Sequence, residues 1–527
     1  MPRRAFYKVL KKKLQIWAGL LLLNGHFLAV EAPARPLAAL EAPAEQRLYY
    51  RVAIDGTPAG RMMVTESRGE GLRTSAVELE LVFRRAGSTQ SLGMASRFVE
   101  TADGQPVEAW SSQRLGSSPI EVTYRFLADG IDIETRQGDN TFRRRVPKTS
   151  GWQPPAAADE ATQRSIAAAL AGGPTRFSVT SVDPLLGPEP ATTTWELEAK
   201  SEEIEAGGRR FATSRWRQTE SMAPQVPSIV WLDAAGEIRR TTTEMAGMAM
   251  LIEWTEGEPP LPGEAAGDAA GGRGAAPEVM TQTFLRPDRP LPSPRSLDRA
   301  VYDLIGQDLE LPELGYQRVS KIDGGLRLTV DLAAAREESL GPAGLAPYLG
   351  ASIFINHENG AVRKLHRQAL ESAWSGASPP ARAELLRRFV LGFLEKKDLE
   401  SVLATASEVA VSASGDCTEH AVLLAALLRA DGIPSRVVFG LIYIDSFAGQ
   451  RQIFGYHMWT QAYLSGRFVD LDATLEAPFD AAHISLGASA LEAESSSLAT
   501  LHNAMQALSK AKLVVVEPAV PAAKPGP

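Results

Sequence analysis

The sequence contains one cysteine, Cys417, in 527 residues. A lone cysteine excludes an intrachain disulfide framework and the paired cysteine ligands of structural zinc sites. The seven histidines are scattered, and no HExxH motif or EF-hand loop occurs, so we predict no metal site. No P-loop or GxGxxG motif follows a strand-like run, so we predict no nucleotide cofactor either.

Basic charge is also scarce, because the formal net charge is −8 and the only long basic run lies at the N-terminus. This balance argues against a nucleic-acid partner. The charged content of 22% and the hydrophobic content of 44% are typical of globular proteins. The length is sufficient for two or three domains with cores of their own.

The N-terminus has the composition of a signal peptide. Basic residues between Arg3 and Lys13 precede an apolar stretch, residues 14–30, and small residues follow near Ala32. Because the apolar run is short and interrupted, we expect residues 1–32 to be cleaved; an uncleaved anchor is the alternative and would be the only membrane contact. The predicted location is therefore outside the cytoplasm, in the periplasm or cell envelope.

Short alternating apolar runs separated by turn residues fill residues 46–254, after a Pro/Ala-rich lead-in over residues 33–45. Examples are AVELELVFR and IEVTYRFLADGIDIETR. This pattern predicts an antiparallel all-β domain, a curved sheet or barrel-like sandwich, with one helix near residues 158–170. Residues 255–279 are rich in Pro and Gly and read as a linker.

The remaining chain is predicted to hold a small mixed α/β module, an α+β domain and a tail. The module covers residues 280–345, with a short helix at 298–305. The α+β domain covers residues 346–510, with amphipathic helices at 361–372 and 381–396 and further helices at 399–406 and 490–508. The composition of residues 511–527 predicts a disordered tail.

Cys417 lies at the start of the most clearly defined helix in the sequence. Asp416 can cap this helix, and Glu419 three residues later completes a D-x-x-E capping box. Gly432 and Pro434 end the helix. A thiol in the first helical turn is favoured as a thiolate, as a nucleophile requires. The alternative is that Cys417 is a small buried apolar residue.

A predicted β-hairpin follows, in which YHMWTQAYL and RFVDLDAT flank a turn at Ser465 and Gly466. Pairing Leu464 with Arg467 makes His457 and Asp472 diagonal cross-strand neighbours on one face. The opposite, apolar face would pack on the cysteine helix. A carboxylate that orients an imidazole beside a thiol is the arrangement of a catalytic triad.

Several nearby residues could take a second role. His420 lies one helical turn after Cys417 and is a less favoured base, and Asp470 is the second candidate for the orienting acid. Trp459 and Tyr456 are either walls of a site or packing residues. The segment beginning at His483 is expected to return toward the site.

The order Cys417, His457, Asp472, within GDCTEHAVLLAALLRADGIPSRVVFGLIY, YHMWTQAYL and RFVDLDAT, resembles the transglutaminase-like superfamily, whose fold is papain-like. The resemblance implies that Cys417 is the nucleophile, His457 the general base and acid, and Asp472 the orienting carboxylate. Ala473 stands where family members often have proline.

The function implied by this resemblance is thiol-dependent acyl transfer. Some transglutaminases use calcium, but the sequence shows no cluster of calcium ligands, so we predict no cofactor. The reaction would be transamidation, deamidation or amide hydrolysis on an envelope protein or a peptide, including a cell-wall-linked one. Two further functions stay open, a cysteine peptidase and a non-catalytic envelope scaffold or binding protein.

Overall fold

The computed structural model describes residues 44–519, except residues 115–117, 246, 265–275, 308, 372–375, 396–402, 493–507 and 510. The predicted signal peptide lies outside the described residues, as do most of the lead-in and most of the predicted helix at 490–508. The chain divides into two compact units, Met1–Val279 and Met280–Pro527. The boundary falls at the end of the predicted linker.

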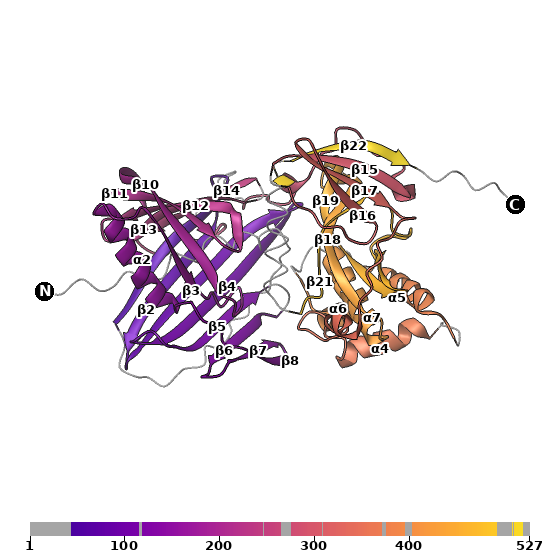
Figure 1. Ribbon diagram of the computed structural model, residues 1–527, viewed down its shortest axis with the longest axis horizontal. Coiled ribbons are helices and arrows are strands. Elements are labelled where there is room, and N and C mark those ends of the chain that lie inside the picture. Colours follow the sequence, from indigo (N-terminus) through magenta and orange to yellow (C-terminus); the bar gives the residue numbers. More distant parts are fainter. Residues whose placement is uncertain are drawn as a thin grey trace. The chain divides into compact units, whose positions relative to one another are not determined.

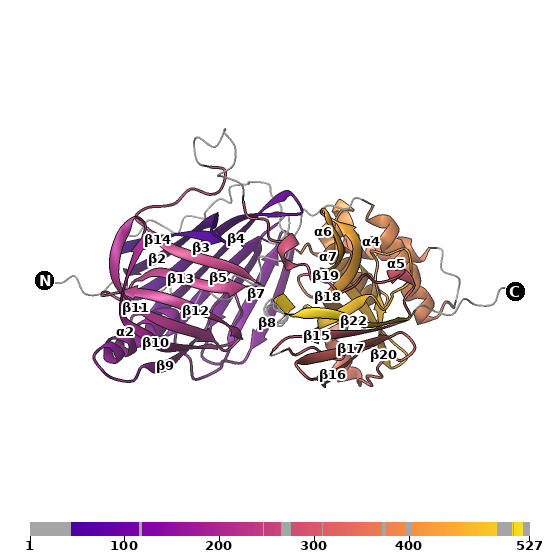
Figure 2. The same ribbon diagram turned by 90° about the horizontal axis from the view of Figure 1, so that it is seen from above.

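The first unit is built on a single antiparallel sheet of 14 strands, in the order β8-β7-β6-β5-β4-β3-β2-β1-β14-β13-β12-β11-β10-β9. Buried and partly buried residues alternate along β4, as expected for a sheet with one face on a core. The sheet confirms the predicted antiparallel β domain, and it curls on itself in Figures 1 and 2. Its strands are β1 (Ala44–Ile54), β2 (Thr57–Gly69), β3 (Leu72–Arg85), β4 (Ser88–Thr101), β5 (Pro106–Arg114), β6 (Ile120–Phe126), β7 (Ile131–Gln137), β8 (Asn140–Val146), β9 (Arg176–Ser181), β10 (Ala191–Ala206), β11 (Arg209–Glu220), β12 (Ala223–Asp233), β13 (Ile238–Met245) and β14 (Met248–Thr255).

Helix α2 (Pro155–Leu170) joins the two halves of this sheet. At its N-terminus, the buried carboxylate of Glu100 on β4 accepts a hydrogen bond from the backbone N–H of Ala156 at 3.0 Å. Further along, Gln163 donates to the backbone oxygen of Gly236, between β12 and β13, at 3.1 Å. The helix is therefore tied to strands from both halves of the sheet.

The second unit contains two four-stranded sheets, in the orders β16-β17-β15-β22 and β20-β19-β18-β21. Their strands are β15 (Arg299–Ile305), β16 (Gln317–Ile322), β17 (Gly325–Asp331), β18 (Ser435–Phe447), β19 (Gln450–Leu464), β20 (Arg467–Leu471), β21 (His483–Ser489) and β22 (Lys512–Ala519). The helices are η1 (Thr281–Thr283), η2 (Pro294–Ser296), α3 (Pro342–Leu345), η3 (Ala346–Tyr348), α4 (Gly360–Leu370), α5 (Pro379–Phe393), α6 (Ala406–Ser412) and α7 (Cys417–Ala430).

The strands β18 and β19 of the sheet β20-β19-β18-β21 pack on α7, where Thr460 on β19 donates to the backbone oxygen of Ala421 at 2.9 Å. Further along the same strands, Phe454 belongs to an apolar core shared with the sheet β16-β17-β15-β22, which contributes Tyr302 and Leu328. Figure 1 shows β15, β16, β17 and β22 around the upper end of β18 and β19, and helices α4–α7 around their lower end. This α+β arrangement confirms the predicted fold class.

Three local predictions for this unit are wrong. In the predicted helix at 399–406, residues 403–405 are not helical and α6 begins only at Ala406; residues 399–402 lie outside the described residues. Residues 299–305, predicted as a helix, form the central strand β15, because it pairs with both β17 and β22 and its alternate residues enter the core. Residues 512–519, predicted as part of a disordered tail, form β22. Leu513 and Val515 are buried in the shared core, a gain that composition alone does not reveal.

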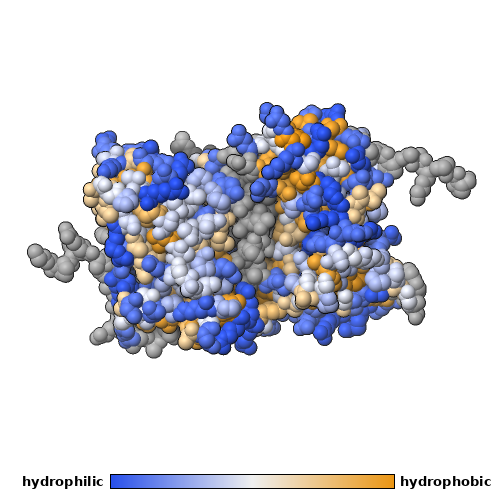
Figure 3. Space-filling model, in the orientation of Figure 1, coloured by the Kyte–Doolittle hydropathy of each residue, from blue (hydrophilic) through white to orange (hydrophobic). Residues whose placement is uncertain are grey.

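Figure 3 shows small hydrophobic groups separated by hydrophilic surface on this face of each unit. Within the described ranges, no helix has both the length and the apolar character needed to span a membrane. The large hydrophobic side chains exposed there are Leu72, Val107, Leu127, Ile305, Leu349, Val411 and Val516.

Candidate active site

Cys417 is the first residue of α7 and is half-buried. The capping box predicted around it is present. The side chain of Asp416 accepts a hydrogen bond from the backbone N–H of Thr418, and the side chain of Glu419 accepts one from the backbone N–H of Asp416, both at 2.9 Å. The sulfur-bearing residue is thus held in the first helical turn, where the helix dipole favours negative charge.

Glu419 also ties this turn to the preceding loop. Its second oxygen accepts from the backbone N–H of Ala404 at 3.1 Å. Burial, and after it the charge of Asp416, raises the pKa of Glu419 well above its ordinary value. A Cβ atom at Gly415 would lie only 2.3 Å from the Cβ of Glu419, so glycine is required there for this close approach.

His457 and Asp472 meet through the predicted hairpin. Leu464 pairs with Arg467, and the same register continues to Thr460 and Leu471. The Nε2 atom of His457 lies 2.8 Å from Oδ2 of Asp472, so the predicted contact between these two side chains is present. Since Asp472 occupies Nε2, the ring has Nδ1 for exchanging a proton with another group.

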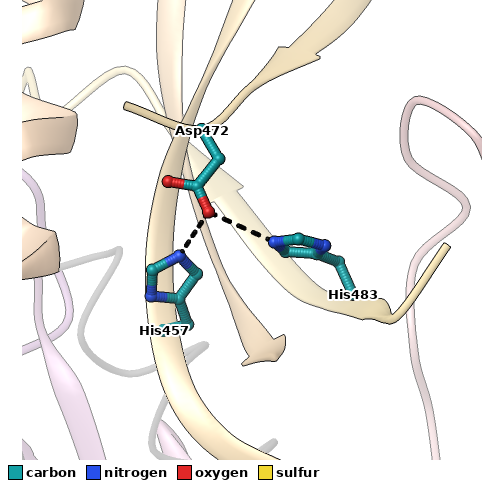
Figure 4. A group of neighbouring side chains, drawn as sticks. All are labelled: His457, Asp472 and His483. Carbon is teal, nitrogen blue, oxygen red and sulfur yellow. Dashed lines mark hydrogen bonds and ion pairs between the residues drawn. The ribbon is translucent and has the colours of Figure 1, made fainter. Parts of the chain in front are cut away.

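Asp472 is buried and receives four hydrogen bonds. Its Oδ1 accepts from the backbone N–H and the hydroxyl of Thr474 at 2.8 and 2.7 Å. Its Oδ2 faces Nε2 of His457 and, at 3.2 Å, Nε2 of His483 (Figure 4). Burial alone would raise the pKa of Asp472, but the charge and hydrogen bonds of His457, followed by those of His483, hold it well below its ordinary value.

His483 is the residue at this site whose role the sequence did not indicate. It begins β21 and is 1% exposed, and its Nδ1 lies 3.0 Å from both Oδ1 and the backbone oxygen of Asp480. Burial would lower the pKa of His483, but its hydrogen bonds to Asp472 and Asp480 raise it to about 9. The available signal was that its segment was expected to return toward the site, as it does.

Asp470, the second candidate for the orienting acid, belongs to a different network. Its Oδ1 accepts from Nε1 of Trp459 at 2.7 Å and from Nε2 of Gln461 at 2.8 Å. Burial raises its pKa to about 6, although both hydrogen bonds act to lower it. Asp470 therefore supports the neighbouring tryptophan, whereas Asp472 contacts His457.

His420, Trp459 and Tyr456 lie in three different surroundings. The ring of His420 is buried and turned back onto its own helix, with Nδ1 2.6 Å from the backbone oxygen of Asp416. Trp459 lies beside both histidines of the site, 6.0 Å from the ring of His457 and 5.3 Å from that of His483, measured between centroids. Tyr456 packs against the apolar core instead. Trp459 is therefore the one of the three that borders the pair of histidines.

Among the described residues, His457, Asp472 and His483 are also the group whose metal-ligand atoms lie closest together, within 4.8 Å of one another. Both ring nitrogens are directed at one carboxylate oxygen, at hydrogen-bonding distances of 2.8 and 3.2 Å. A metal bonded at about 2.0–2.2 Å to each ligand would have to displace the protons of both bonds. Each ring nitrogen of His483 faces a carboxylate, Asp480 at Nδ1 and Asp472 at Nε2. We therefore interpret the group as a hydrogen-bonded cluster and not as a metal site.

Comparison with known families identifies one domain of this chain. Residues 382–473 match the transglutaminase-like superfamily, and the chain therefore carries a transglutaminase-like domain. Cys417, His457 and Asp472 lie inside the matched residues, whereas Asp480 and His483 lie beyond them. No curated protein matches the chain.

Solved structures with similarity to this chain are distant. One from Cytophaga hutchinsonii, described as a "putative cysteine protease", has 16% identity and a TM-score of 0.25, covering 36% of this chain and 79% of its own. A beta-barrel-like protein from Brucella abortus has 13% identity and a TM-score of 0.31, covering 41% of this chain and 98% of its own. A "putative protease" from Parabacteroides distasonis has 11% identity and a TM-score of 0.20, covering 78% of this chain and 69% of its own.

Proposed function

We propose that the transglutaminase-like domain catalyses thiol-dependent acyl transfer, with Cys417 as nucleophile, His457 as general base and acid, and Asp472 as orienting carboxylate. The observation that carries this proposal is the 2.8 Å hydrogen bond between His457 and Asp472. His457 lies on β19, which packs against the helix that begins with the single cysteine of the chain, and Asp472 directly follows β20. The buried carboxylate fixes the ring and stabilises its protonated form.

The directions of the two elements support this pairing. The chain reverses between α7 and β18, and β18 is antiparallel to β19, so α7 and β19 run the same way. Thr460 and Ala421 are joined by a hydrogen bond. Measured from that contact toward the N-terminus of each element, Cys417 lies about 6 Å along α7 and His457 about 10 Å along β19. Both residues therefore lie toward the same end of the packed helix and strand.

The chemistry that follows is a two-step exchange. The thiolate of Cys417 adds to an amide carbonyl, and the backbone N–H of Cys417 donates to the developing oxyanion. His457 gives a proton from Nδ1 to the leaving amine, which leaves a thioester on the sulfur. An acceptor then loses a proton to His457 and attacks the thioester, and the sulfur leaves as the thiolate beside protonated His457. An amine acceptor gives transamidation, and water gives hydrolysis or, with a side-chain amide, deamidation.

The substrate class we propose follows from the N-terminal sequence. A basic run followed by an apolar run is typical of export, so the substrate would be an envelope protein or a peptide, including one linked to the cell wall. A cysteine peptidase would differ from this proposal only in using water at a backbone amide.

The presence of one cysteine makes the first test specific to one residue. We expect iodoacetamide to alkylate Cys417 at pH 6 at least tenfold faster than a free thiol, and the rate to fall toward that of a free thiol in His457→Gln. His366→Gln, which removes another histidine paired with an aspartate, is the matched control. Alkylation as slow as that of a free thiol, together with unchanged turnover in Cys417→Ala, would refute the assignment.

A panel of substrates then distinguishes the acceptors. Glutamine-containing proteins with an added alkyl amine report transamidation by amine incorporation, and ammonia release without amine reports deamidation. Cleavage of peptides or of peptidoglycan stem peptides reports hydrolysis of a backbone amide. Rapid alkylation with no turnover on any of these would favour a scaffold that retains an activated thiol.

A further inference from the structure

Asp472 is shared, because one of its oxygens faces two histidines. His457 and His483 approach Oδ2 at 2.8 and 3.2 Å, and their ring centroids are 5.9 Å apart. Figure 4 shows the two rings pointing at this oxygen from different strands. Two cations on one carboxylate oxygen repel each other, so the charge of one histidine affects the protonation of the other.

The surroundings of His483 favour its charged form. Both ring nitrogens face carboxylates, Nε2 toward Asp472 and Nδ1 toward Asp480, and a neutral imidazole has only one N–H to donate. The ring of Phe479 lies 4.3 Å from that of His483, centroid to centroid. An aromatic ring at this distance excludes water and tolerates a cation.

The charges around His483 form an alternating row. The guanidinium of Arg295 lies 2.9 Å from the carboxylate of Asp480, and Asp480 contacts His483. On its other side, His483 contacts Asp472, and Asp472 contacts His457. Asp470 also acts on His483 through its charge, and Arg387 donates to the backbone oxygen of Asp472. Arg295 precedes β15 and Asp480 precedes β21, so this row reaches the site from outside the residues that match the family.

We propose that His483 is a positioning residue that sets the charge state of the acyl-transfer site: held between Asp472 and Asp480, it limits how strongly Asp472 stabilises protonated His457. This inference rests on the proposed function and adds a residue to it. Its consequence is that the charge of His483 acts on the proton of His457, the residue that must give a proton to the leaving amine and take one from the acceptor.

The expected size of the effect follows from the distance. Two unit charges 5.9 Å apart, at an effective dielectric constant of about 20, repel each other enough to move the pH of half-protonation of either group by about two units. Neutralising His483 should therefore move the pH at which His457 loses its proton upward by about 1–2 units. The same change should move formation of the Cys417 thiolate to lower pH, because protonated His457 would persist beside it.

The test uses His483→Gln and Asp480→Asn in the full chain, with His366→Gln as control. Gln can still donate to Asp472, and Asn keeps an oxygen for the backbone N–H of Ala482. NMR of 13C-labelled histidine rings follows the titration of His457, assigned by its loss in His457→Gln. Iodoacetamide alkylation between pH 4 and 10 follows the thiolate. EDTA in every sample removes adventitious metal.

We expect the His457 titration to move up by 1–2 units in His483→Gln, in the same direction but less in Asp480→Asn, and not in His366→Gln. A merely structural role would lower rates at every pH and leave both midpoints in place; unchanged midpoints in either folded variant would overturn the inference. If the His457 midpoint moves while Cys417 is alkylated no faster than a free thiol, the role of His483 stands and the proposed function fails. If Cys417→Ala abolishes turnover while the midpoints stay fixed, the proposed function stands and the role of His483 fails.

Discussion

Arg387 on α5 donates from Nη1 to the backbone carbonyl oxygen of Asp472 at 3.0 Å, from a segment about 85 residues earlier in the chain. The same nitrogen donates to the backbone oxygen of Leu475 at 2.6 Å, and Glu384 pairs with the guanidinium. The side chain of Arg387 is 2% exposed, so this buried cation fixes the loop that carries Asp472. Positioning of the orienting carboxylate thus depends on a helix outside the hairpin.

Replacing Arg387 by Met should destabilise the fold by about 2–4 kcal/mol, because two backbone carbonyl groups lose a buried donor and Glu384 loses one of its two arginine partners. Urea unfolding followed by circular dichroism measures this. Arg388→Met is the matched control, since Arg388 pairs with the same Glu384 but is 69% exposed, and we expect a change below about 0.5 kcal/mol. Equal losses in the two variants would contradict the role of Arg387.

The two aspartates of the hairpin should differ in their effect on activity. Asp472→Asn places an amide N–H₂ or a weaker acceptor against His457, and we expect turnover to fall by roughly 10²–10⁴-fold. Asp470→Asn keeps an oxygen that accepts from Trp459 and Gln461, so turnover should stay within about threefold. Steady-state kinetics on the substrate found by the panel gives both numbers. A larger loss in Asp470→Asn than in Asp472→Asn would reverse the assignment.

Stability should decrease as the pH rises from 6.5 to about 9. The ordinary pKa of His483 is 6.5 and its folded-state pKa is about 9, so the folded protein holds this proton more tightly than the unfolded chain. The resulting stabilisation is complete below pH 6.5 and is lost by about pH 9, a decrease of about 3 kcal/mol. Asp470, with a pKa of about 6, titrates below this range. Urea midpoints at a series of pH values should fall in the unsubstituted protein and stay nearly level in His483→Gln; parallel curves would count against the charged form of His483.

Gly440 on β18 has no room for a side chain beside the site. A Cβ atom there would lie 2.3 Å from Trp459 and 2.4 Å from the backbone oxygen of Ile484. Gly440→Ala should cost more than about 2 kcal/mol, because the indole and β21 must both move. Gly392→Ala on α5 meets no atom within 4 Å and should be neutral or stabilising by up to about 1 kcal/mol. Similar unfolding midpoints for the two variants would contradict this prediction and show that β18 accommodates a side chain at position 440.

Much of the candidate site could be predicted because its determinants are local. The capping box depends on Asp416 and Glu419, three residues apart, and its hydrogen bonds form within one helical turn. The two-residue turn at Ser465 and Gly466 fixes the hairpin register, which carries His457 to Asp472. In the first unit, the alternation of apolar residues indicated the antiparallel sheet for the same reason.

The errors concern segments whose structure depends on distant partners. The sequence RAVYDLI of β15 fits a short amphipathic helix as well as a strand, and pairing with β17 and β22 decides between them. Similarly, β22 contains a proline and follows no clear pattern of alternation. It becomes ordered because Leu513 and Val515 pack into a core that contains residues of β15 and β17, such as Tyr302 and Leu328, far earlier in the chain.

The sequence by itself determined the helix that begins with Cys417, the hairpin that joins His457 to Asp472, and the division into a β-rich and an α+β part, because capping, turn chemistry and side-chain periodicity act over a few residues. Only the tertiary structure decided that His483 shares the oxygen of Asp472, that Asp480 holds the other side of that ring, and that Arg387 fixes the loop. These contacts join different strands and helices, and no local pattern encodes them. Their energies come from burial of charge, which exists only once the layers have packed.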